Sequence, residues 1–376
     1  MDNRLSIAIV GAGMGGLTAA IALIGMGHDV TIFEQAREFG RVGADINLTP
    51  NAVHVLDRLG IGERLRATAA RPTHRISRMW DTGEETSRLE MSDTAEEKYG
   101  APQLTIHRAD LLSALEEKID PARFRMGYKA TAVDESDDAV TVTFADGETL
   151  SFDVVIGADG IHSAVRGAVF GPENPQFTGL VSWRATFPRE KAADLPNLDA
   201  FTKWWGPEPS RQIVTFPLTA GREIFVFATT PQVDWREESW TTPGDIGELR
   251  AAYADFNPEA RRLLDACDSV TKSALHVRDP LPRWSTGRVT LLGDAAHPMT
   301  PFMAQGACQA IEDAIVLARA LEAADGAGVP DALQRYEAAR KERTARIQIA
   351  SRGNEWLKKG GNADWVYGYD AWQAAV

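Results

Sequence analysis

The sequence has few cysteines and no metal-binding arrangement of histidines. Only Cys267 and Cys308 occur among the 376 residues, and they lie far apart in the chain. Two such cysteines provide neither a disulfide framework nor a thiolate metal site. The seven histidines are scattered singly, without a ligand spacing such as H-E-x-x-H. We therefore expect no metal site.

Basic residues are fewer than acidic residues, and the sequence contains no apolar run long enough to span a membrane. Forty Lys and Arg against 53 Asp and Glu give a net charge of −13, without a basic cluster, which argues against a nucleic-acid partner. No run approaches the roughly 18 apolar residues that cross a bilayer. The start, MDNRLSIAIVGAG, leads into a strand without a signal-peptide layout. We expect a cytoplasmic protein that binds neither nucleic acid nor membrane, with a length that favours two domains.

The order of apolar segments predicts an α/β protein. Residues 5–10 and 29–34 are apolar runs typical of buried parallel strands, and residues 14–26 between them carry apolar side chains at helical spacing. Asp146-Gly147 predicts the turn of a hairpin that leads into another buried strand within 139–160. Further helices are predicted over 50–65, 108–119, 306–323 and 331–350.

Between Gln176 and Cys267 the segments become strand-like and aromatic. This texture predicts an antiparallel sheet inserted into the first domain. Its strands are expected over 180–187, 200–205, 211–218 and 222–230.

A dinucleotide-binding fingerprint follows the first strand. Gly11, Gly13 and Gly16 fit G-x-G-x-x-G, and Glu34 ends the second strand, where a carboxylate can bind a ribose. Gly11 serves the tight turn, Gly13 the close approach of a pyrophosphate, and Gly16 the packing of helix on strand. The N-terminus of the following helix attracts phosphates.

Residues 153–166 and 289–314 indicate that the bound dinucleotide is a flavin and not a nicotinamide. A flavin is longer than one βαβ unit can cover, so further loops must reach its ribityl chain and ring. Asp294 ends an apolar strand and can accept hydrogen bonds from ribityl hydroxyls. The helix that begins at Gly306 can face the flavin pyrimidine, where negative charge accumulates on reduction. We expect FAD to lie across this loop.

Four motifs resemble the single-component FAD-dependent aromatic hydroxylases, which include the salicylate and 4-hydroxybenzoate hydroxylases. They are GAGMGG, IHRADL with Arg108, ADGIHSAVR and GDAAHPMTPFMAQGA. The segments ADGIHS, KWW and WVYGYD resemble the hydroxynicotinate hydroxylases in particular. The resemblance covers almost the whole chain. It implies a Rossmann-like FAD-binding domain of the 4-hydroxybenzoate hydroxylase type (GR2) over 1–70, 101–175 and 270–350, an inserted substrate-binding antiparallel sheet over 71–100 and 176–269, and C-terminal helices followed by an aromatic tail over 351–376.

The same resemblance implies the cofactor site. Asp159 is implicated in FAD binding and in the handling of NADH or NADPH. Since the chain has one fingerprint, the nicotinamide is expected to bind transiently and to meet a flavin that swings outward. The expected FAD-binding residues are Gly11, Gly13, Gly15, Gly16, Glu34, Gln35, Arg108, Ala130, Asp159, Asp294, Gln305, Gly306 and Ala307.

The substrate side departs from the hydroxynicotinate hydroxylases. Where their GAG.H segment carries a histidine, this chain has Asn47. Where the resemblance implies a Cys, a His, a Tyr and a further His around the substrate, it has Thr202, Arg211, Thr215 and Phe302, so all the expected acid–base groups are missing. Arg211 is the expected anchor of a carboxylate, because a guanidinium binds one bidentately. Further candidates are His74 and Arg184, whereas His297 is expected to be structural or to lie beside the flavin. The predicted catalytic residues are Asn47, Arg211 and Thr215, and the predicted substrate-binding residues are Asn47, Thr202, Trp204, Arg211, Thr215 and Phe302.

The predicted reaction is the hydroxylation, with or without decarboxylation, of a small aromatic acid or hydroxypyridine. By resemblance it uses FAD, NADH or NADPH, and O₂, through a flavin C4a-hydroperoxide. A monomer or a homodimer is expected. Three alternatives stay open: an oxidase or reductase of the same fold, a non-catalytic flavoprotein, and a plain NAD-dependent dehydrogenase. The yield of hydroxylated product relative to hydrogen peroxide separates the first alternative from a hydroxylase.

Overall fold

A five-stranded parallel sheet forms the centre of the first domain, and its strands come from the N-terminal, middle and later parts of the chain. The computed structural model describes residues 4–40, 45–235, 237, 241–353 and 363–376. The sheet has the order β18-β11-β1-β2-β7, and each pair in it is parallel. Its strands are β1 (Ser6–Val10), β2 (Asp29–Glu34), β7 (Phe124–Met126), β11 (Val154–Gly157) and β18 (Val289–Leu291).

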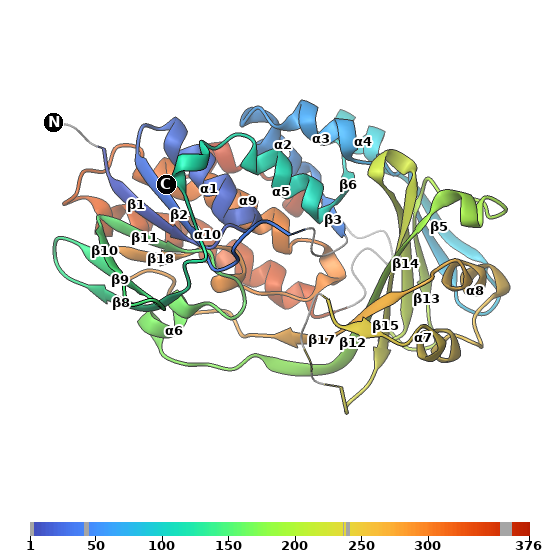
Figure 1. Cartoon of the computed structure of the whole chain (residues 1–376). Coiled ribbons are helices and arrows are strands. Elements are labelled where there is room, and N and C mark those ends of the chain that lie inside the picture. Colours follow the sequence, from blue (N-terminus) through green and yellow to red (C-terminus); the bar gives the residue numbers. More distant parts are fainter. Residues whose placement is uncertain (1–3, 41–44, 236, 238–240, 354–362) are drawn as a thin grey trace.

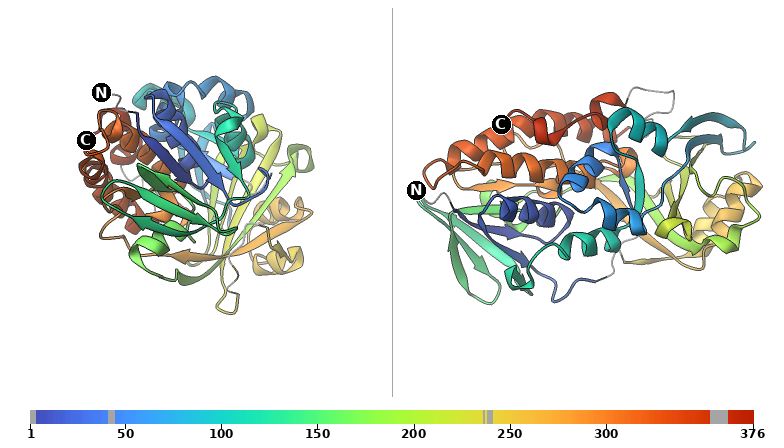
Figure 2. Two further views of the ribbon diagram at one scale, coloured as in Figure 1. Left: turned by 60° about the vertical axis from the view of Figure 1, so that its left-hand side comes forward. Right: turned by 90° about the horizontal axis from the view of Figure 1, so that it is seen from above.

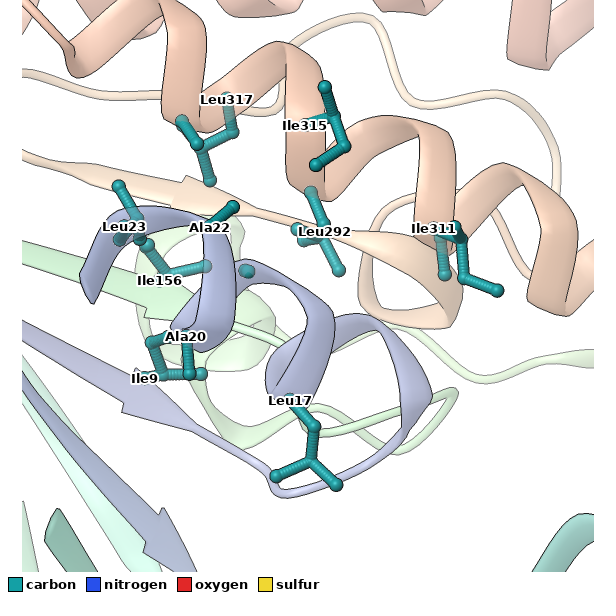
Figure 3. Close-up of a cluster of buried hydrophobic side chains, with 14 of the residues drawn as sticks. Ile9, Leu17, Ala20, Ala22, Leu23, Ile156, Leu292, Ile311, Ile315 and Leu317 are labelled. Atoms are coloured by element: carbon teal, nitrogen blue, oxygen red, sulfur yellow. The ribbon is translucent and has the colours of Figure 1, made fainter. Parts of the chain in front are cut away.

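Helix α1 (Met14–Gly25) lies between this sheet and helix α9 (Gly306–Leu321) (Figure 3). Ile9 and Ile156 of the sheet pack below α1, while Ile311 and Ile315 of α9 pack on its other side. The two helices approach so closely that a Cβ atom at Gly15 would lie 3.0 Å from the Cβ atom of Ala310 in α9, and 2.4 Å from the Leu292 side chain after β18. This apolar core fixes the βαβ unit and α9 relative to each other.

Further helices and a small sheet complete the first domain. Helix α10 (Val329–Ser351) runs beside α9, as Figure 2 shows. Phe33 of β2 packs on Phe144 and Phe152 of an antiparallel three-stranded sheet. The remaining elements here are α2 (Pro50–Arg58), α3 (Gly62–Thr68), α4 (Ser92–Tyr99), α5 (Arg108–Glu116), β8 (Ala130–Glu135), β9 (Val140–Phe144), β10 (Thr149–Phe152) and α6 (Ala164–Phe170).

One predicted helix is two helices. The segment predicted to be helical over 50–65 breaks between α2 and α3, where Gly60 adopts a φ of +73°. A glycine reaches this left-handed conformation without a Cβ penalty and so ends the first helix. The other predicted helices and strands are present, with ends that differ by a few residues and with β12 extended at its N-terminal end.

An eight-stranded sheet forms the other part of the molecule (Figure 1). Its order is β16-β17-β12-β15-β14-β13-β4-β5, and β13 pairs in parallel with β4 whereas the other pairs are antiparallel. Its strands are β4 (His74–Met79), β5 (Glu85–Glu90), β12 (Gln176–Pro188), β13 (Phe201–Trp205), β14 (Gln212–Leu218), β15 (Glu223–Pro231), β16 (Pro243–Gly244) and β17 (Val270–Val277). The sequence division placed 270–277 in the first domain, but β17 pairs with β12 here.

The two faces of this sheet have different neighbours. Helices α7 (Ile246–Ala252) and α8 (Pro258–Asp265) cover what we call the far face, where Trp204 and Ile213 join one apolar cluster with Leu249 and Leu263. The opposite face, which we call the near face, is turned toward the first domain. Phe302 of the first domain packs there on the cluster of Val214, Phe216, Leu218, Phe225 and Phe227.

A short antiparallel ribbon joins the two parts. Strands β3 (Asp45–Leu48) and β6 (Leu104–His107) pair with Asp45 opposite His107 and Asn47 opposite Thr105. The Thr105 hydroxyl donates a 2.6 Å hydrogen bond to the Pro217 carbonyl of β14. Alternate residues of the ribbon enter the core of the first domain, namely Ile46, Leu48, Leu104 and Ile106. Asp45, Asn47, Thr105 and His107 therefore share the face turned toward the eight-stranded sheet.

The aromatic tail packs on its own chain. Helix α11 (Asp364–Tyr367) contributes Val366 and Tyr367 to a cluster with Met303 and Ile347. Arg343 of α10 donates to the Trp365 carbonyl at 2.6 Å. Among the described residues, no helix is long and apolar enough to cross a bilayer, and His, Cys, Asp and Glu form no cluster suited to a metal ion.

Candidate functional site

The glycine loop fits the phosphates of a dinucleotide. Gly11 has a φ of +107°, and a Cβ atom at Gly16 would lie 2.1 Å from the Gly11 carbonyl oxygen, so both positions require glycine. A Cβ atom at Gly13, by contrast, would meet nothing within 4 Å. The turn is therefore open where a pyrophosphate has to approach the N-terminus of α1. Gly15, which was expected to contact the cofactor, instead allows α1 to pack on α9.

Three charged groups meet beside this loop. The Glu34 carboxylate accepts hydrogen bonds from the N–H groups of Ala12 at 2.9 Å and Ala36 at 2.8 Å. Burial lowers the pKa of the Arg108 guanidinium, and the negative charges of Asp294 and Glu34 oppose this shift. Asp294 is exposed in the turn that follows β18. These side chains suit the ribose, phosphates and ribityl hydroxyls of FAD.

The N-terminus of α9 lies next to Asp294. A Cβ atom at Gly306 would be 3.9 Å from an Asp294 carboxylate oxygen, and no side chain caps this end of the helix. The first N–H groups at Gly306 and Ala307 can therefore donate to a flavin ring. The Gln305 side chain instead points inward and bonds to Thr49 at 2.8 Å and to Asn51 at 3.2 Å.

A buried ionic network holds this helix end and the Asp294 turn. Asp313 accepts from Gly293 N–H at 3.2 Å, from His297 Nε2 at 2.6 Å and from Arg340 at 2.7 Å. Burial alone would raise the pKa of the Asp313 carboxyl, but His297 and Arg340 bring it below its usual value. Glu312 is likewise paired with Arg340. His297 is thus structural, and the network itself was not predicted from the sequence.

Asp159 has structural partners close to the glycine loop. It accepts from the Ser163 hydroxyl at 2.5 Å and from the Ala164 N–H at 2.7 Å, and so caps α6. Burial raises the pKa of the Asp159 carboxyl, an effect that these hydrogen bonds partly oppose. Its contact with FAD or a nicotinamide stays a prediction, as do those of the exposed Gln35 and of Ala130, which is buried at the start of β8.

The structure moves Arg211 away from the expected substrate region. Its guanidinium donates to Asp255 at 2.7 Å and to the Ala252 carbonyl at 2.6 Å, beside the rings of Tyr253 and Phe256. All these partners belong to α7 or to its connection with α8, on the far face. The prediction of Arg211 as a carboxylate anchor is therefore corrected. Its guanidinium is already paired with groups of α7 and of the connection to α8, two helices that the sequence pattern did not predict.

Three further predictions lie on the wrong face of the sheet. Thr202 pairs with Thr215 and Trp204 pairs with Ile213, so all four side chains point to the far face. In a strand the next residue points to the opposite face. The near face accordingly presents Phe201, Trp205 and Phe216. Phe201 and Phe216 stack there with ring centroids 5.1 Å apart.

Phe302 and Asn47 do lie between the two parts. Phe302 packs on the near-face cluster. Asn47 is buried, and its amide oxygen accepts a 2.7 Å hydrogen bond from Gln103. Cys308 is also buried, and its Sγ lies 3.5 Å from the Asn47 carbonyl oxygen, so it supports β3 from α9. His74 pairs with Glu90 of the edge strand β5.

On the near face, four side chains form a row that crosses four neighbouring strands, with one side chain from each strand. Arg184 of β12, Phe227 of β15, Val214 of β14 and Lys203 of β13 are successive cross-strand neighbours. We call these four residues the cross-strand row. Two cations thus lie at the ends of an apolar centre, about 14 Å apart at Cα for three strand spacings. Of these four, sequence reasoning had named only Arg184.

Known proteins resemble this chain over almost its whole length. A model of the FAD binding domain family matches residues 4–351. The 6-hydroxynicotinate 3-monooxygenase of Bordetella bronchiseptica is 39% identical over 374 residues, which cover 99% of this chain and 97% of the relative. The 3-amino-4-hydroxybenzoate 2-monooxygenase PtmB3 of Streptomyces platensis is 38% identical over 389 residues. The match covers 98% of this chain and 97% of the relative. A solved salicylate hydroxylase substrate complex superposes with a TM-score of 0.85 at 28% identity. The superposition covers 99% of this chain and 97% of the solved chain.

These similarities confirm the resemblance, the fold class, the FAD cofactor and the class of enzyme that the sequence predicted. They do not test the individual site residues, which rest on the geometry above. The chain belongs to the FAD-binding family of flavin-dependent aromatic-ring monooxygenases.

Proposed function

We propose that this enzyme hydroxylates a small benzenoid acid that carries a ring hydroxyl, with NADH or NADPH as reductant and O₂ as co-substrate. The relatives named above act, by their names, on aromatic acids with such a hydroxyl. When bound, FAD supplies the redox chemistry that uses the reductant and activates O₂. Gly13, Glu34, Arg108 and Asp294, with the N-terminus of α9, are the groups that would hold it.

The cross-strand row is the observation that carries this proposal. Its centre, Phe227 and Val214, adjoins Phe216, Phe225 and Phe302, so an aromatic ring finds apolar contacts. The apolar side chains at this centre offer no hydrogen-bond partner to a ring nitrogen packed against them, so the desolvation of that nitrogen would be uncompensated there. A benzenoid acid is therefore favoured over 6-hydroxynicotinate.

Lys203 is the proposed anchor of the substrate carboxylate. It lies on the near face of β13, half-buried, with its ammonium 3.6 Å from the centroid of the Trp205 ring. An ammonium that is partly removed from water attracts a carboxylate more strongly than an exposed one. The ring would then extend along the row toward Arg184 and place the hydroxyl near that end.

A product assay tests the proposal. The FAD-loaded enzyme would be offered salicylate, 3-hydroxybenzoate, 4-hydroxybenzoate, 3-amino-4-hydroxybenzoate and 6-hydroxynicotinate, together with the matching carboxamides. NADH and NADPH oxidation, hydroxylated product and hydrogen peroxide would be measured separately. We expect product from at least one benzenoid acid, little from its amide, and mostly peroxide from 6-hydroxynicotinate. Tight coupling with 6-hydroxynicotinate, or peroxide alone from every compound, would refute the proposal.

Oligomeric state and location are proposed only from the sequence. A monomer or homodimer in the cytoplasm is consistent with the composition. Mass photometry of the purified FAD-loaded protein would measure the number of subunits.

A further inference from the structure

An acidic residue lies on the ribbon face that is turned toward the near face. Asp45 and Asn47 are two residues apart on β3 and therefore point the same way, while Ile46 enters the core of the first domain. The resemblance described above puts a glycine and a histidine at these positions of the hydroxynicotinate hydroxylases. This chain thus carries an acid at position 45 and an amide at position 47. The ionisable side chain therefore lies two residues earlier on the same face of the strand than the histidine that the resemblance implies.

Two titratable or charged groups of the described residues face Asp45. Arg184 of β12 acts on its carboxylate through its positive charge, and His107 stands opposite Asp45 on β6. Arg184 is buried, donates to the Ser182 hydroxyl at 2.8 Å and lies over the Phe227 ring at 5.5 Å. Asp45 therefore adjoins the end of the cross-strand row at which the substrate hydroxyl is proposed to lie.

The surroundings also tune this carboxyl toward neutral pH. Burial raises the pKa of Asp45, and Arg184 and the Asp45 backbone N–H oppose the shift, so that it reaches about 6. A carboxyl with its pKa near the working pH is suited to proton transfer in either direction. Asn47 has no such capacity, because an amide does not titrate near neutral pH.

We propose that Asp45 is the catalytic base that accepts the proton of the substrate's ring hydroxyl, with Arg184 as its positioning partner. This assignment rests on the proposed function of the site. In the step, the O–H bond of the substrate breaks and an O–H bond forms on the Asp45 carboxylate. The electron pair stays on the ring oxygen, where it activates the ring carbon for hydroxylation, and nothing is oxidised or reduced. Arg184 stabilises the ring oxyanion and keeps the carboxylate beside it.

His107 is the competing candidate for this role. Its Nδ1 accepts the Ala109 N–H at 3.2 Å at the start of α5, which ties the ring to the backbone. A hydrogen-bonded cap of this kind stabilises a helix end. We therefore assign His107 a structural role and include it as a control.

The test compares pH profiles of FAD-loaded variants with the best benzenoid acid of the panel above. The variants are Asp45→Asn, Asp45→Glu, His107→Gln and the double variant Asp45→Gly with Asn47→His. The measured quantities are kcat/KM for hydroxylated product between pH 5 and 10, and FAD content. A second readout is the ultraviolet difference spectrum of the bound acid without NADH or NADPH, which reports whether its hydroxyl is ionised.

We expect an acidic limb near pH 6 in the parent and in Asp45→Glu and His107→Gln. Asp45→Asn should retain FAD, lose about 100-fold in kcat/KM at pH 7, bind the acid with its hydroxyl neutral, and recover as the pH approaches the hydroxyl's own pKa. The double variant should restore at least 10-fold of the loss. An unchanged acidic limb and an ionised bound hydroxyl in Asp45→Asn would overturn the assignment. Loss of the limb in His107→Gln alone would transfer the role to His107. Absence of product from the parent enzyme refutes the proposed function instead, so the two failures are distinguishable.

Discussion

The two faces of the eight-stranded sheet use the same strands for different purposes. On the far face, Trp204 and Ile213 pack with α7 and α8 in an apolar cluster, and the Arg211 guanidinium is paired with Asp255. On the near face, the adjacent positions Lys203 and Val214 belong to a row that faces the FAD-binding part. A shift of one residue along β13 or β14 thus exchanges a structural role for a ligand-binding one. Stability and substrate recognition should therefore separate cleanly between neighbouring residues.

Trp204→Ala should have the largest effect on stability. Trp204 is fully buried on the far face, and Arg78 lies 4.3 Å from its ring centroid. Removing the ring leaves a cavity that costs about 3–5 kcal/mol. Urea unfolding should show this loss while KM for the aromatic acid stays within about twofold. A raised KM at unchanged stability would place Trp204 at the substrate and contradict the assignment of the far face to a structural role.

Asp294→Ala should show the converse, a loss of ligand without a loss of fold. Asp294 is exposed, and charged hydrogen bonds of the kind it offers to ribityl hydroxyls contribute about 1.5–3 kcal/mol each. The purified variant should be largely free of FAD, whereas its FAD-free form should unfold at the same urea concentration as the FAD-free parent. Glu34→Ala is the matched comparison and should retain more flavin. Stoichiometric FAD in the Asp294 variant would remove this residue from the site.

Asp45→Asn should change how stability depends on pH. The folded pKa of Asp45, about 6, lies above the unfolded value near 3.9, so the folded state binds the extra proton between these pH values. The corresponding stability is fully present below pH 4 and is lost as the pH rises through 6. The unfolding free energy of the parent, relative to the variant, should therefore fall by up to about 3 kcal/mol between pH 4 and 7. A difference that stays constant over this window would show that Asp45 has an ordinary pKa.

Thr215→Val should have the smallest effect. Thr215 is buried on the far face next to Thr202, and valine has nearly the same shape. Since the exchange removes only a hydroxyl, we expect the free energy of unfolding to change by less than about 1 kcal/mol. We expect kcat/KM for hydroxylation to stay unchanged. Val214→Thr, its near-face neighbour, is the control and should raise KM. A large kinetic effect of Thr215→Val would return this residue to the substrate site.

The sequence was sufficient for the βαβ unit and for α9 because their signals are local. The fingerprint glycines, the strand-ending Glu34 and the apolar periods of α1 and α9 each depend on a few neighbouring residues. The ribbon of β3 and β6 was missed, since two four-residue strands carry too little periodicity to be recognised, and Asp45 was missed with it. The network around Glu312 and Asp313 was also missed. Its partner Arg340 lies on another helix, although two acids inside an apolar helix are a signal.

The orientation of β13 and β14 could not be predicted for a physical reason. All seven residues of β14 are buried, because Phe302 and its neighbours cover one face and α7 and α8 cover the other. A strand that is buried on both sides lacks the polar alternation that identifies its outer face. The segment was recognised as a strand, but Thr202, Trp204 and Thr215 were assigned to the wrong side. The pairing register and the position of the helices resolve this ambiguity.

The most direct test of this account is the affinity of an aromatic acid for two cation variants. Lys203→Met removes a charge from the near face, and Arg211→Met removes one from the far face eight residues later in the sequence. The dissociation constant of the best benzenoid acid would be measured by the change it causes in the absorbance of bound FAD, without reductant. We predict a 10- to 100-fold weaker affinity for Lys203→Met, about the value of one charge-assisted hydrogen bond, and a change below twofold for Arg211→Met. The reverse result, weak binding by Arg211→Met and unchanged binding by Lys203→Met, would contradict the assignment of the substrate to the near face.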